Sequence, residues 1–343
     1  MVQKLVTNQF NNKLEKELLN FFHSSGLPLH PNKTGNKEFT NYQRVSLMIL
    51  FHRSKKSLRD FIEELYESKW VSWLGLKKIP GKSTLHDWLM TFNMRMLRKL
   101  SKVLLPRKIN LTAIDGTGFD SWQRSRHYEK RVGEVSVPHM PYAKADIFID
   151  VDSQIILDFS LITHREHDVK VAEKIFKRNN IENIFGLGDK GYDSEKLHII
   201  ARINGITFYA PPRKKNKNSD KKNPTGKHRR ECTELPEFFG KRSLVEMVIS
   251  VLKRKQINSL RSKKSFMKQR EFGWHVILYN INRKMKISES TEIQTFIFFK
   301  IKIYSIRTEP NIKESFKVAF FHTIFSLLTS IFILGIFMAS GFN

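Results

Sequence analysis

The sequence predicts an α/β protein in which a five-stranded sheet is flanked by helices. From Leu111 onward, short apolar runs rich in β-branched residues alternate with helix-like segments, which is typical of an α/β domain. Before that point apolar residues recur at helical spacing, and after Arg283 the chain becomes strongly apolar. We therefore expect a helical N-terminal region (1–106), an α/β domain (107–285) and an apolar C-terminal tail (286–343).

Composition points to a polyanionic partner. The chain of 343 residues has a formal net charge of +27 and a pI of about 10.0. An excess of cations spread along the chain indicates nucleic acid, although a ribosome-type structural protein or plain solubility would also account for it. Cys232 is the only cysteine, which excludes an internal disulfide and a cysteine-based zinc site. Residues 1–20 show no secretory signal, so we expect a cytoplasmic, nucleoid-associated protein.

The N-terminal region has the texture of a small helical module. Residues 1–40 are polar and weakly periodic, and 34–41 is expected to be a linker or turn. Helical spacing is found in the segments 42–51, 58–65, 83–92 and 94–105. Ser83 or Thr84 is expected to cap the third of these helices. Short helices with exposed Lys and Arg suggest a helix-turn-helix-like DNA-binding module, although many small helical domains share this pattern.

The α/β domain is expected to run β, β, β, α, β, α, β, α. Residues 111–117 form the first strand, and Asp152–Ser153 joins a hairpin made from 142–162. The later strands are expected at 181–189 and 206–213, and the helices near Asp168, at 194–205 and at 241–256. Asp168 is expected to cap its helix.

Three acidic residues in this order form a candidate metal site. Asp115 lies on the first strand, Asp189 at the end of the fourth, and Glu246 on the helix after the fifth. In phosphodiester cleavage, two metal ions about 3.5–4 Å apart can activate the attacking water and stabilise the leaving oxygen. Mg²⁺ prefers oxygen ligands. We therefore expect the three acids to converge and hold two divalent ions that serve to cut and rejoin DNA.

Basic residues accompany the acids along the chain. The segment 213–230 is highly charged and poor in apolar residues, which predicts a disordered arm that grips DNA phosphates, or simply a solvated loop. The phosphate contacts expected from it are Arg213, Lys214, Lys215, Arg229 and Arg230. Within 241–256, Arg242 and Lys253 share a helical face with Glu246. The apolar face of that helix is expected to contain Leu244, Met247, Val248, Val251 and Leu252.

The C-terminal tail contains a long uncharged stretch. Residues 318–339 include no Asp, Glu, Lys or Arg, and the stretch falls within the range of about 17–25 residues that can span a bilayer. It predicts membrane association through 318–339. A packed helix, a dimerisation element, or sequence unrelated to function are the other interpretations.

Three sequence blocks carry a resemblance to a known family. Phe239, Arg242, Glu246 and Lys253 are separated by two, three and six residues. AIDGTGF contains Asp115, and GDKGYDS contains Asp189. Together these blocks resemble the motifs of the DDE-class transposases of insertion sequences, in the families numbered four and five, which have Tyr at the place of Phe239. The resemblance covers about residues 40–283.

The resemblance implies an RNase H-like fold with a mixed sheet, and a metal-dependent reaction in two stages. Water first cuts the ends of the element, and the exposed 3′-hydroxyls then attack target DNA. Asp115, Asp189 and Glu246 would bind two Mg²⁺ or Mn²⁺ ions, and Lys253 and Arg242 would contact phosphate near the cut end. Asp193 would cap a helix. The implied partners are double-stranded DNA, as terminal inverted repeats and as target, and a second copy of the chain in a homodimer.

Two other functions fit parts of the sequence. A catalytically inactive DNA-binding protein, such as a decayed transposase copy, would keep the basic charge, although the presence of all three acids favours an enzyme. A tail-anchored membrane protein would account for residues 318–339.

Overall fold

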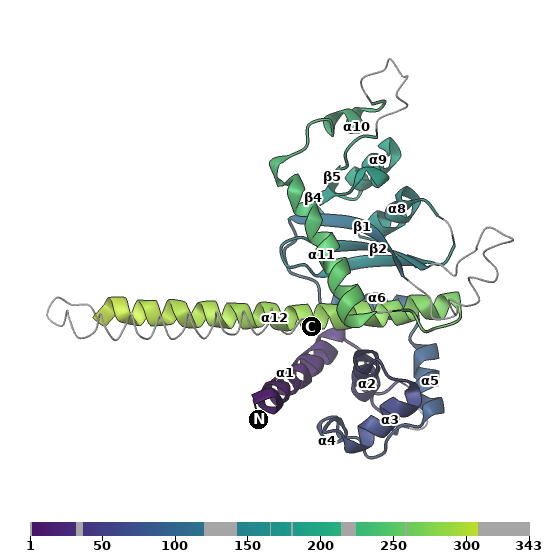
Figure 1. Ribbon diagram of the computed structural model, residues 1–343, viewed down its shortest axis with the longest axis vertical. Coiled ribbons are helices and arrows are strands. Elements are labelled where there is room, and N and C mark those ends of the chain that lie inside the picture. The colour runs from purple at the N-terminus through teal and green to yellow at the C-terminus, as the bar shows by residue number, and fades with distance from the viewer. Residues whose placement is uncertain are drawn as a thin grey trace. The chain divides into compact units, whose positions relative to one another are not determined.

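The computed structural model describes residues 2–31, 37–119, 143–164, 166–179, 181–213, 224–257 and 259–307. The chain divides into two compact units, Met1–Lys286 and Ile287–Asn343. The first unit contains the helical region and the sheet (Figure 1). The uncharged stretch 318–339 lies outside the described residues, and none of the described helices is both long and apolar enough to cross a membrane.

The N-terminal region is helical, as the sequence predicts from residue 41 onward. Its helices are α1 (Val2–Ser25), α2 (Asn41–Ser54), α3 (Leu58–Glu67), α4 (Trp70–Trp73), α5 (Lys82–Thr91) and α6 (Met94–Lys102). Thr40 caps α2 through a reciprocal pair of hydrogen bonds with Gln43. The prediction that Ser83 or Thr84 caps α5 is wrong, because Gly81 occupies the N-cap and no side chain accepts from the first turn.

Helix α1 was not expected from the sequence. Leu14, Leu18 and Phe21 lie at spacings of four and three, so they share one face of the helix, and all three are buried in the core of the helical region. Polar residues surround this short stripe and weaken the helical period. Tertiary packing of the stripe, rather than a strong local pattern, therefore accounts for α1.

The described residues of the α/β domain form a mixed five-stranded sheet in the order β3-β2-β1-β4-β5. The strands are β1 (Leu111–Phe119), β2 (Ala143–Asp150), β3 (Ile156–Ile162), β4 (Ile184–Leu187) and β5 (Ile206–Tyr209). β1, β2 and β3 pair antiparallel, whereas β4 pairs parallel with both β1 and β5. The predicted class, a mixed five-stranded sheet with helices, is confirmed, as is the predicted succession of strands and helices along the chain, and the topology is consistent with an RNase H-like fold.

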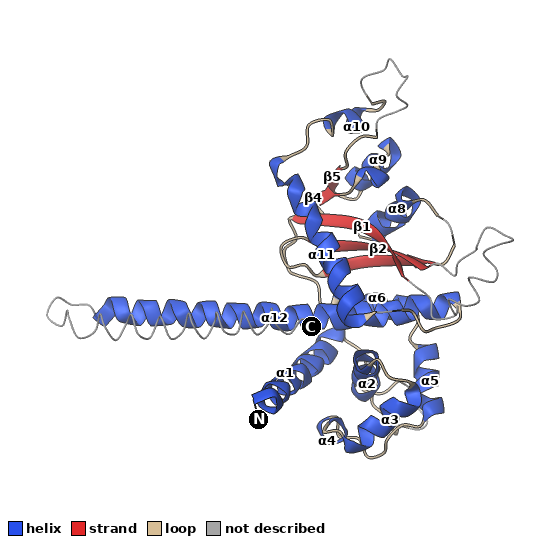
Figure 2. Ribbon diagram, viewed as in Figure 1, coloured by secondary structure: helices blue, strands red, loops and turns tan. Residues whose placement is uncertain are grey.

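Helices cover both faces of this sheet (Figure 2). α8 (Asp168–Arg178) and α9 (Glu195–Ile203) pack on one face, where Ile114 and Phe148 join their core. α11 (Ser243–Val251) and the first turns of α12 (Ser265–Arg307) pack on the other face, over Ala113, Ile147 and Leu187. The same part of α12 contributes Trp274 and Ile277 to the core of the N-terminal helices. The helical region and the sheet are thus joined through α12.

Two of the predicted helix caps are wrong, and one predicted helix has mixed geometry. Asp168 is the first residue of α8 and His167 its N-cap, and Ser194 rather than Asp193 precedes α9. The expected helix 241–256 consists of a 3₁₀ turn (Glu237–Arg242), α11 and a π-helical turn (Leu252–Gln256).

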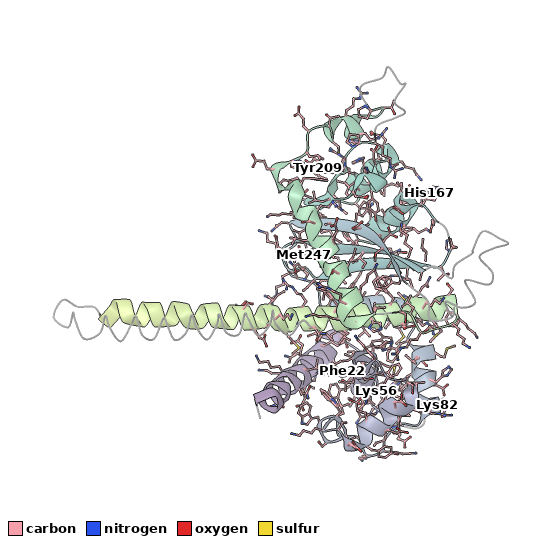
Figure 3. The ribbon with its side chains drawn as sticks, in the orientation of Figure 1. Phe22, Lys56, Lys82, His167, Tyr209 and Met247 are labelled. Atoms are coloured by element: carbon pink, nitrogen blue, oxygen red, sulfur yellow. The ribbon has the colours of Figure 1, made fainter. Side chains whose placement is uncertain are left out.

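The apolar face of α11 also differs from the prediction. Val245 and Ile249 are buried, while Met247, which is labelled in Figure 3, is 54 % exposed. The basic segment 213–230 is not irregular throughout, since Lys227–Glu231 forms the short helix α10. Residues 214–223 lie outside the described residues.

Candidate active site

The sheet places two acids on the face that α11 covers. Ala113 of β1 pairs with Leu187 of β4 in parallel register, so Asp115 and Asp189 each lie two residues further along, at the same edge. Side chains two residues apart along a strand share a face, and both Ala113 and Leu187 belong to the core under α11. Asp189 follows the end of β4 as the N-cap of η1 (Lys190–Tyr192). Parallel pairing therefore brings the two acids together on one face.

The third acid comes from α11, which packs on that same face. Val245 and Val248 fix the helix on the sheet, and they leave Glu246 52 % exposed at its surface. Burial raises the pKa of the Asp115 carboxyl above its usual range, the Gly116 amide and Arg242 oppose this rise, and Asp189 and Glu246 add to it. Asp189 and Glu246 thus both lie within electrostatic reach of Asp115.

Arg242 links two of the acids directly. One of its terminal nitrogens is 3.9 Å from Asp115 Oδ2, and the other donates to Glu246 Oε1. Arg242 lies four residues before Glu246, so the 3₁₀ turn and the first turn of α11 bring both side chains to the same side. The guanidinium offsets part of the repulsion among the carboxylates.

The acids have the chemistry of a hard-cation site. Carboxylate oxygens are the ligands that Mg²⁺ and Mn²⁺ prefer, and the pKa of Asp115 is raised mainly by burial, with smaller contributions from Asp189 and Glu246. Within the described ranges, however, no three His, Cys, Asp or Glu side chains are already arranged to hold a metal. Asp189 Oδ1 instead accepts a hydrogen bond of 2.7 Å from the Gly191 amide. The donor set fits a divalent ion, while its side chains are engaged with protein partners.

The sequence matches the family model of the transposase DDE domain over residues 106–281. This match covers more than half of the chain and includes all three acids. The chain belongs to the DDE transposase family. It is an enzyme that acts on DNA, and DDE transposase domains generally use divalent metal ions.

A search of solved structures found a distant likeness to a structure described as "Cryo-EM structure of piggyBac transposase synaptic complex with hairpin DNA (SNHP)". The two chains are 12 % identical, with a TM-score of 0.43, over 82 % of this chain and 73 % of that one. A search of curated protein sequences found no significant match.

On the opposite face of the sheet, this transposase has a polar cluster that the sequence did not predict. Asp146 of β2 is fully buried and accepts a hydrogen bond of 2.7 Å from Tyr192, the last residue of η1. Lys144 Nζ lies 3.7 Å from Asp146 Oδ1 and also donates to Asp168. Because Asp189 begins the η1 turn and Tyr192 ends it, this cluster ties the turn that carries Asp189 to the sheet.

Two glycines make room for this cluster. A Cβ atom on Gly116 would lie 2.8 Å from Lys144 Cε and 3.1 Å from Asp146 Oδ1. One on Gly191 would lie 2.7 Å from Asp189 Oδ1 and 3.3 Å from Asp168 Oδ2. At both positions a side chain would collide with its neighbours, which explains why glycine stands at Gly116 of β1 and at Gly191 of the GDKGY block.

The basic residues of the transposase differ in how they are placed. Arg229 is largely buried and hydrogen-bonds both oxygens of Asp193, each at 2.6 Å, and the Arg213 amide donates to the same carboxylate. Burial alone would raise the pKa of Asp193, but these bonds hold it below the usual range. Arg213 and Arg229 therefore both bind the carboxylate of Asp193, the residue that follows η1.

The other expected DNA contacts remain predictions. Arg230 is on α10, where its Nε donates to the Gly226 carbonyl. Lys253 lies in the π-helical turn, with Nζ 5.4 Å from the ring centre of Phe119 at the end of β1. Lys214 and Lys215 lie outside the described residues.

Tyr192→Phe is expected to lower the free energy of unfolding by about 1–3 kcal/mol, because the buried Asp146 carboxylate loses a hydrogen-bond donor. Cleavage of DNA should fall as well, since the turn that carries Asp189 loses its link to β2. Urea unfolding and a nicking assay measure the two effects. Tyr66→Phe is the control, because Tyr66 is 70 % exposed. Equal stability of the two variants would show that the hydroxyl of Tyr192 does not support the fold.

Proposed function

We propose that this transposase cuts the ends of an insertion sequence and joins the freed 3′-hydroxyls to target DNA. The observation that carries the proposal is the gathering of Asp115, Asp189 and Glu246 on one face of the sheet, close enough for two of them to raise the pKa of the third. Carboxylates that lie close to one another favour the binding of cations.

Asp115, Asp189 and Glu246 would hold two Mg²⁺ or Mn²⁺ ions. Such ions, when bound, activate the attacking water or 3′-hydroxyl and stabilise the leaving oxygen. Asp115 comes from the middle strand of the sheet, and both other acids act on its pKa, so it is the acid that we propose as central to the site. The Tyr192–Asp146 link keeps the Asp189 turn in place, and Arg242 offsets charge among the acids.

The basic residues around this face would bind the DNA. Arg242 and Lys253 lie on the segment that covers the acids. Arg213 and Arg229 lie on either side of the basic residues 214–223, and their guanidinium groups are bonded to protein beside η1. Charges so placed can contact phosphates on either side of the cleaved bond. We propose that the substrates are the terminal inverted repeats and target duplex DNA, that the N-terminal helices contribute to binding, and that the chain acts as a homodimer on paired ends.

The proposal is tested with purified protein and labelled DNA that carries the element end. Nicking is expected in Mg²⁺ or Mn²⁺ and is expected to stop when EDTA removes the ions, because the acids alone cannot stabilise the leaving oxygen. Binding, followed by mobility shift, should persist in EDTA. Cleavage at an unchanged rate in EDTA would overturn the two-ion proposal, and binding without cleavage in either metal would favour an inactive DNA-binding protein.

A further inference from the structure

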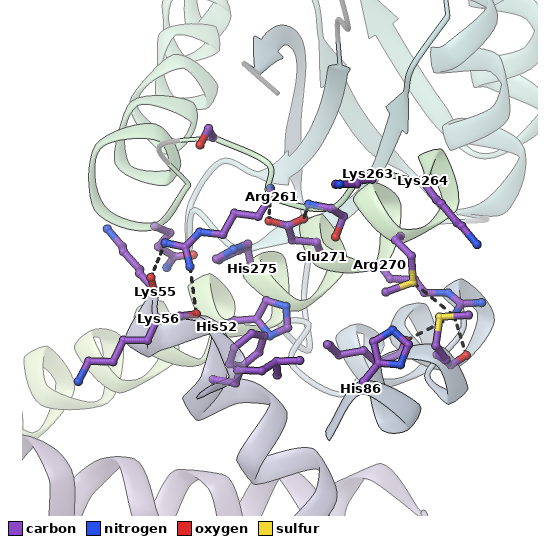
Figure 4. Close-up of a pocket in the computed structure, with 18 residues that line it drawn as sticks. His52, Lys55, Lys56, His86, Arg261, Lys263, Lys264, Arg270, Glu271 and His275 are labelled. Carbon is purple, nitrogen blue, oxygen red and sulfur yellow. Dashed lines mark hydrogen bonds between the residues drawn. The ribbon is translucent and has the colours of Figure 1, made fainter. Parts of the chain in front are cut away.

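A second concave site lies away from the three acids, between the N-terminal helices and the start of α12 (Figure 4). It has a volume of about 550 Å³ and is bordered by the end of α2, by α5 and by the segment from Gln256 to His275. Pockets of about 300–1,000 Å³ are of the size that encloses a small molecule or a single nucleotide. None of the acids proposed for cleavage lines it.

The rim of this cavity is strongly cationic. Six basic side chains line it: Lys55, Lys56, Arg261, Lys263, Lys264 and Arg270. Arg261 and Arg270 also donate to backbone carbonyls, and Lys56 pairs with Glu64 at 3.3 Å. The one carboxylate in the lining, Glu271, accepts from the amides of Arg261 and Ser262 at 2.9 and 2.8 Å. Glu271 thus holds the loop that carries the cations, and it neutralises only a small part of their charge. The rim is suited to a phosphate.

The interior of the cavity has a different character. Phe51, Leu58 and Met267 give it apolar walls, and His52 supplies a further ring. Two buried polar atoms, Gln256 Oε1 and His275 Nδ1, have no hydrogen-bond partner among the described residues. Both side chains are more than nine-tenths buried and both line the cavity. Unpaired buried polar atoms are rare and costly. Both atoms are inaccessible to water, so a ligand in the cavity would pair with them only where it displaces the side chains that cover them.

The interior histidines are suited to a neutral partner. Burial lowers the pKa of His275 well below its usual range, and the cations Lys55 and Arg261 lower it further. His275 is therefore uncharged at neutral pH, and it can donate from one ring nitrogen and accept at the other. A neutral donor and acceptor beside apolar walls match the edge and faces of a nucleobase, whereas the cationic rim matches its phosphate.

We propose that this cavity binds one unpaired nucleotide of a DNA strand, with the base inside and the phosphate at the rim. A base within a duplex is stacked and paired, so only an unpaired one can enter. A free nucleotide offers the same chemistry, and the choice of DNA as its source rests on the transposase family. The site would hold the strand at a position distinct from the bond that is cut.

The test uses the full chain and a fluorescent single-stranded oligothymidylate in EDTA, so that binding is read without cleavage. Met90→Trp fills the cavity without changing charge, because Met90 lines it from α5. Lys263→Glu/Lys264→Glu reverses part of the rim. The matched control is Lys69→Glu/Lys77→Glu, which changes two exposed lysines outside the cavity by the same charge. Circular dichroism verifies that each variant is folded.

The expected result is that Met90→Trp and the rim variant each weaken the single-stranded probe by about tenfold, in line with about 1–3 kcal/mol per stacked base. The affinity of the Lys69→Glu/Lys77→Glu control for the probe should fall clearly less. The affinity of Met90→Trp for duplex DNA should be unchanged. Thymidine monophosphate is expected to compete weakly, and the oligonucleotide strongly. Unchanged affinity in Met90→Trp, an equal loss in the control, or full competition by inorganic phosphate would each overturn the proposal. Because binding is measured in EDTA, these affinities would not change if the protein failed to cleave DNA in the nicking assay.

Discussion

Asp115→Asn is expected to lower the rate of element-end cleavage by at least about a thousandfold, which corresponds to about 4 kcal/mol of activation free energy. The amide keeps the shape of the side chain but removes the charge that two cations would share. DNA binding should persist, because the basic residues are untouched. Labelled-strand nicking and a mobility shift measure the two properties. Asp189→Asn and Glu246→Gln are expected to behave in the same way.

Asp152→Asn is the matched control for this prediction, since Asp152 is an exposed residue of the turn between β2 and β3. It should cleave at the rate of the unchanged chain. Full activity in Asp115→Asn, or an equal loss in Asp152→Asn, would remove Asp115 from the proposed site.

The free energy of unfolding of Asp115→Asn shows whether lost cleavage comes from a lost cation site or from a damaged fold. The pKa of Asp115 is raised in the folded chain, so its contribution to stability is full below the unfolded pKa and is lost as the pH rises through the folded pKa. At neutral pH the charged Asp115 therefore costs stability, and Asp115→Asn should be at least as stable as the unchanged chain. An inactive variant with lower stability would instead indicate unfolding.

The sequence predicts the sheet and two of its acids because both depend on local pattern. Apolar runs mark the strands, and Asp115 and Asp189 each stand beside a glycine. β1 continues past Asp115 to Phe119, two residues beyond the end expected from the sequence. The strand order and the parallel pairing of β1 with β4 then bring the two acids together. Glu246 was found through its spacing from Arg242 and Lys253, which resembles a family motif. Its position over the sheet depends on the packing of Val245 and Val248.

The polar cluster behind the acids could not be predicted in this way. Tyr192 and Asp146 are far apart in the sequence, and their contact depends on the crossover through α8 that returns the chain to β4. A signal was present, since Lys144 and Asp146 alternate along an apolar strand and thus share a face. Without the register of Gly116 against Asp146, that alternation does not show which residues lie opposite.

Helix caps and faces were the least predictable features. Asp193 lies two residues before α9, but its carboxylate accepts two hydrogen bonds from Arg229 and does not cap the helix. Within the segment 241–256, the buried residues Val245, Val248, Ile249 and Leu252 follow the ordinary α-helical spacing. Met247 lies off that stripe, so it is exposed although the sequence predicts that it is buried.

Lys144→Met is expected to lower the free energy of unfolding by about 3–5 kcal/mol, because removing one partner leaves the Asp146 carboxylate buried without its nearest cation. Asp146 is fully buried, and its Oδ2 has no hydrogen-bond partner among the described residues. Met keeps the length and apolar stem of the side chain. Urea unfolding measures the change, with Lys78→Met as the control. The Lys78 side chain in the Lys78–Glu38 pair is 70 % exposed, so the loss of this pair should cost at most about 1 kcal/mol.

The pH dependence of that loss identifies its cause. Burial raises the pKa of Asp146, and the Tyr192 hydroxyl and Lys144 oppose the rise, so removing Lys144 raises the pKa further. A carboxyl with a raised folded pKa costs stability once the pH exceeds the unfolded value near about 4. The deficit of Lys144→Met should therefore grow between pH 4 and 7 and shrink on acidification, when Asp146 is protonated. Adding Asp146→Asn should recover much of the loss at neutral pH. A deficit independent of pH, with no recovery in the double variant, would show that Lys144 supports the fold through packing rather than charge.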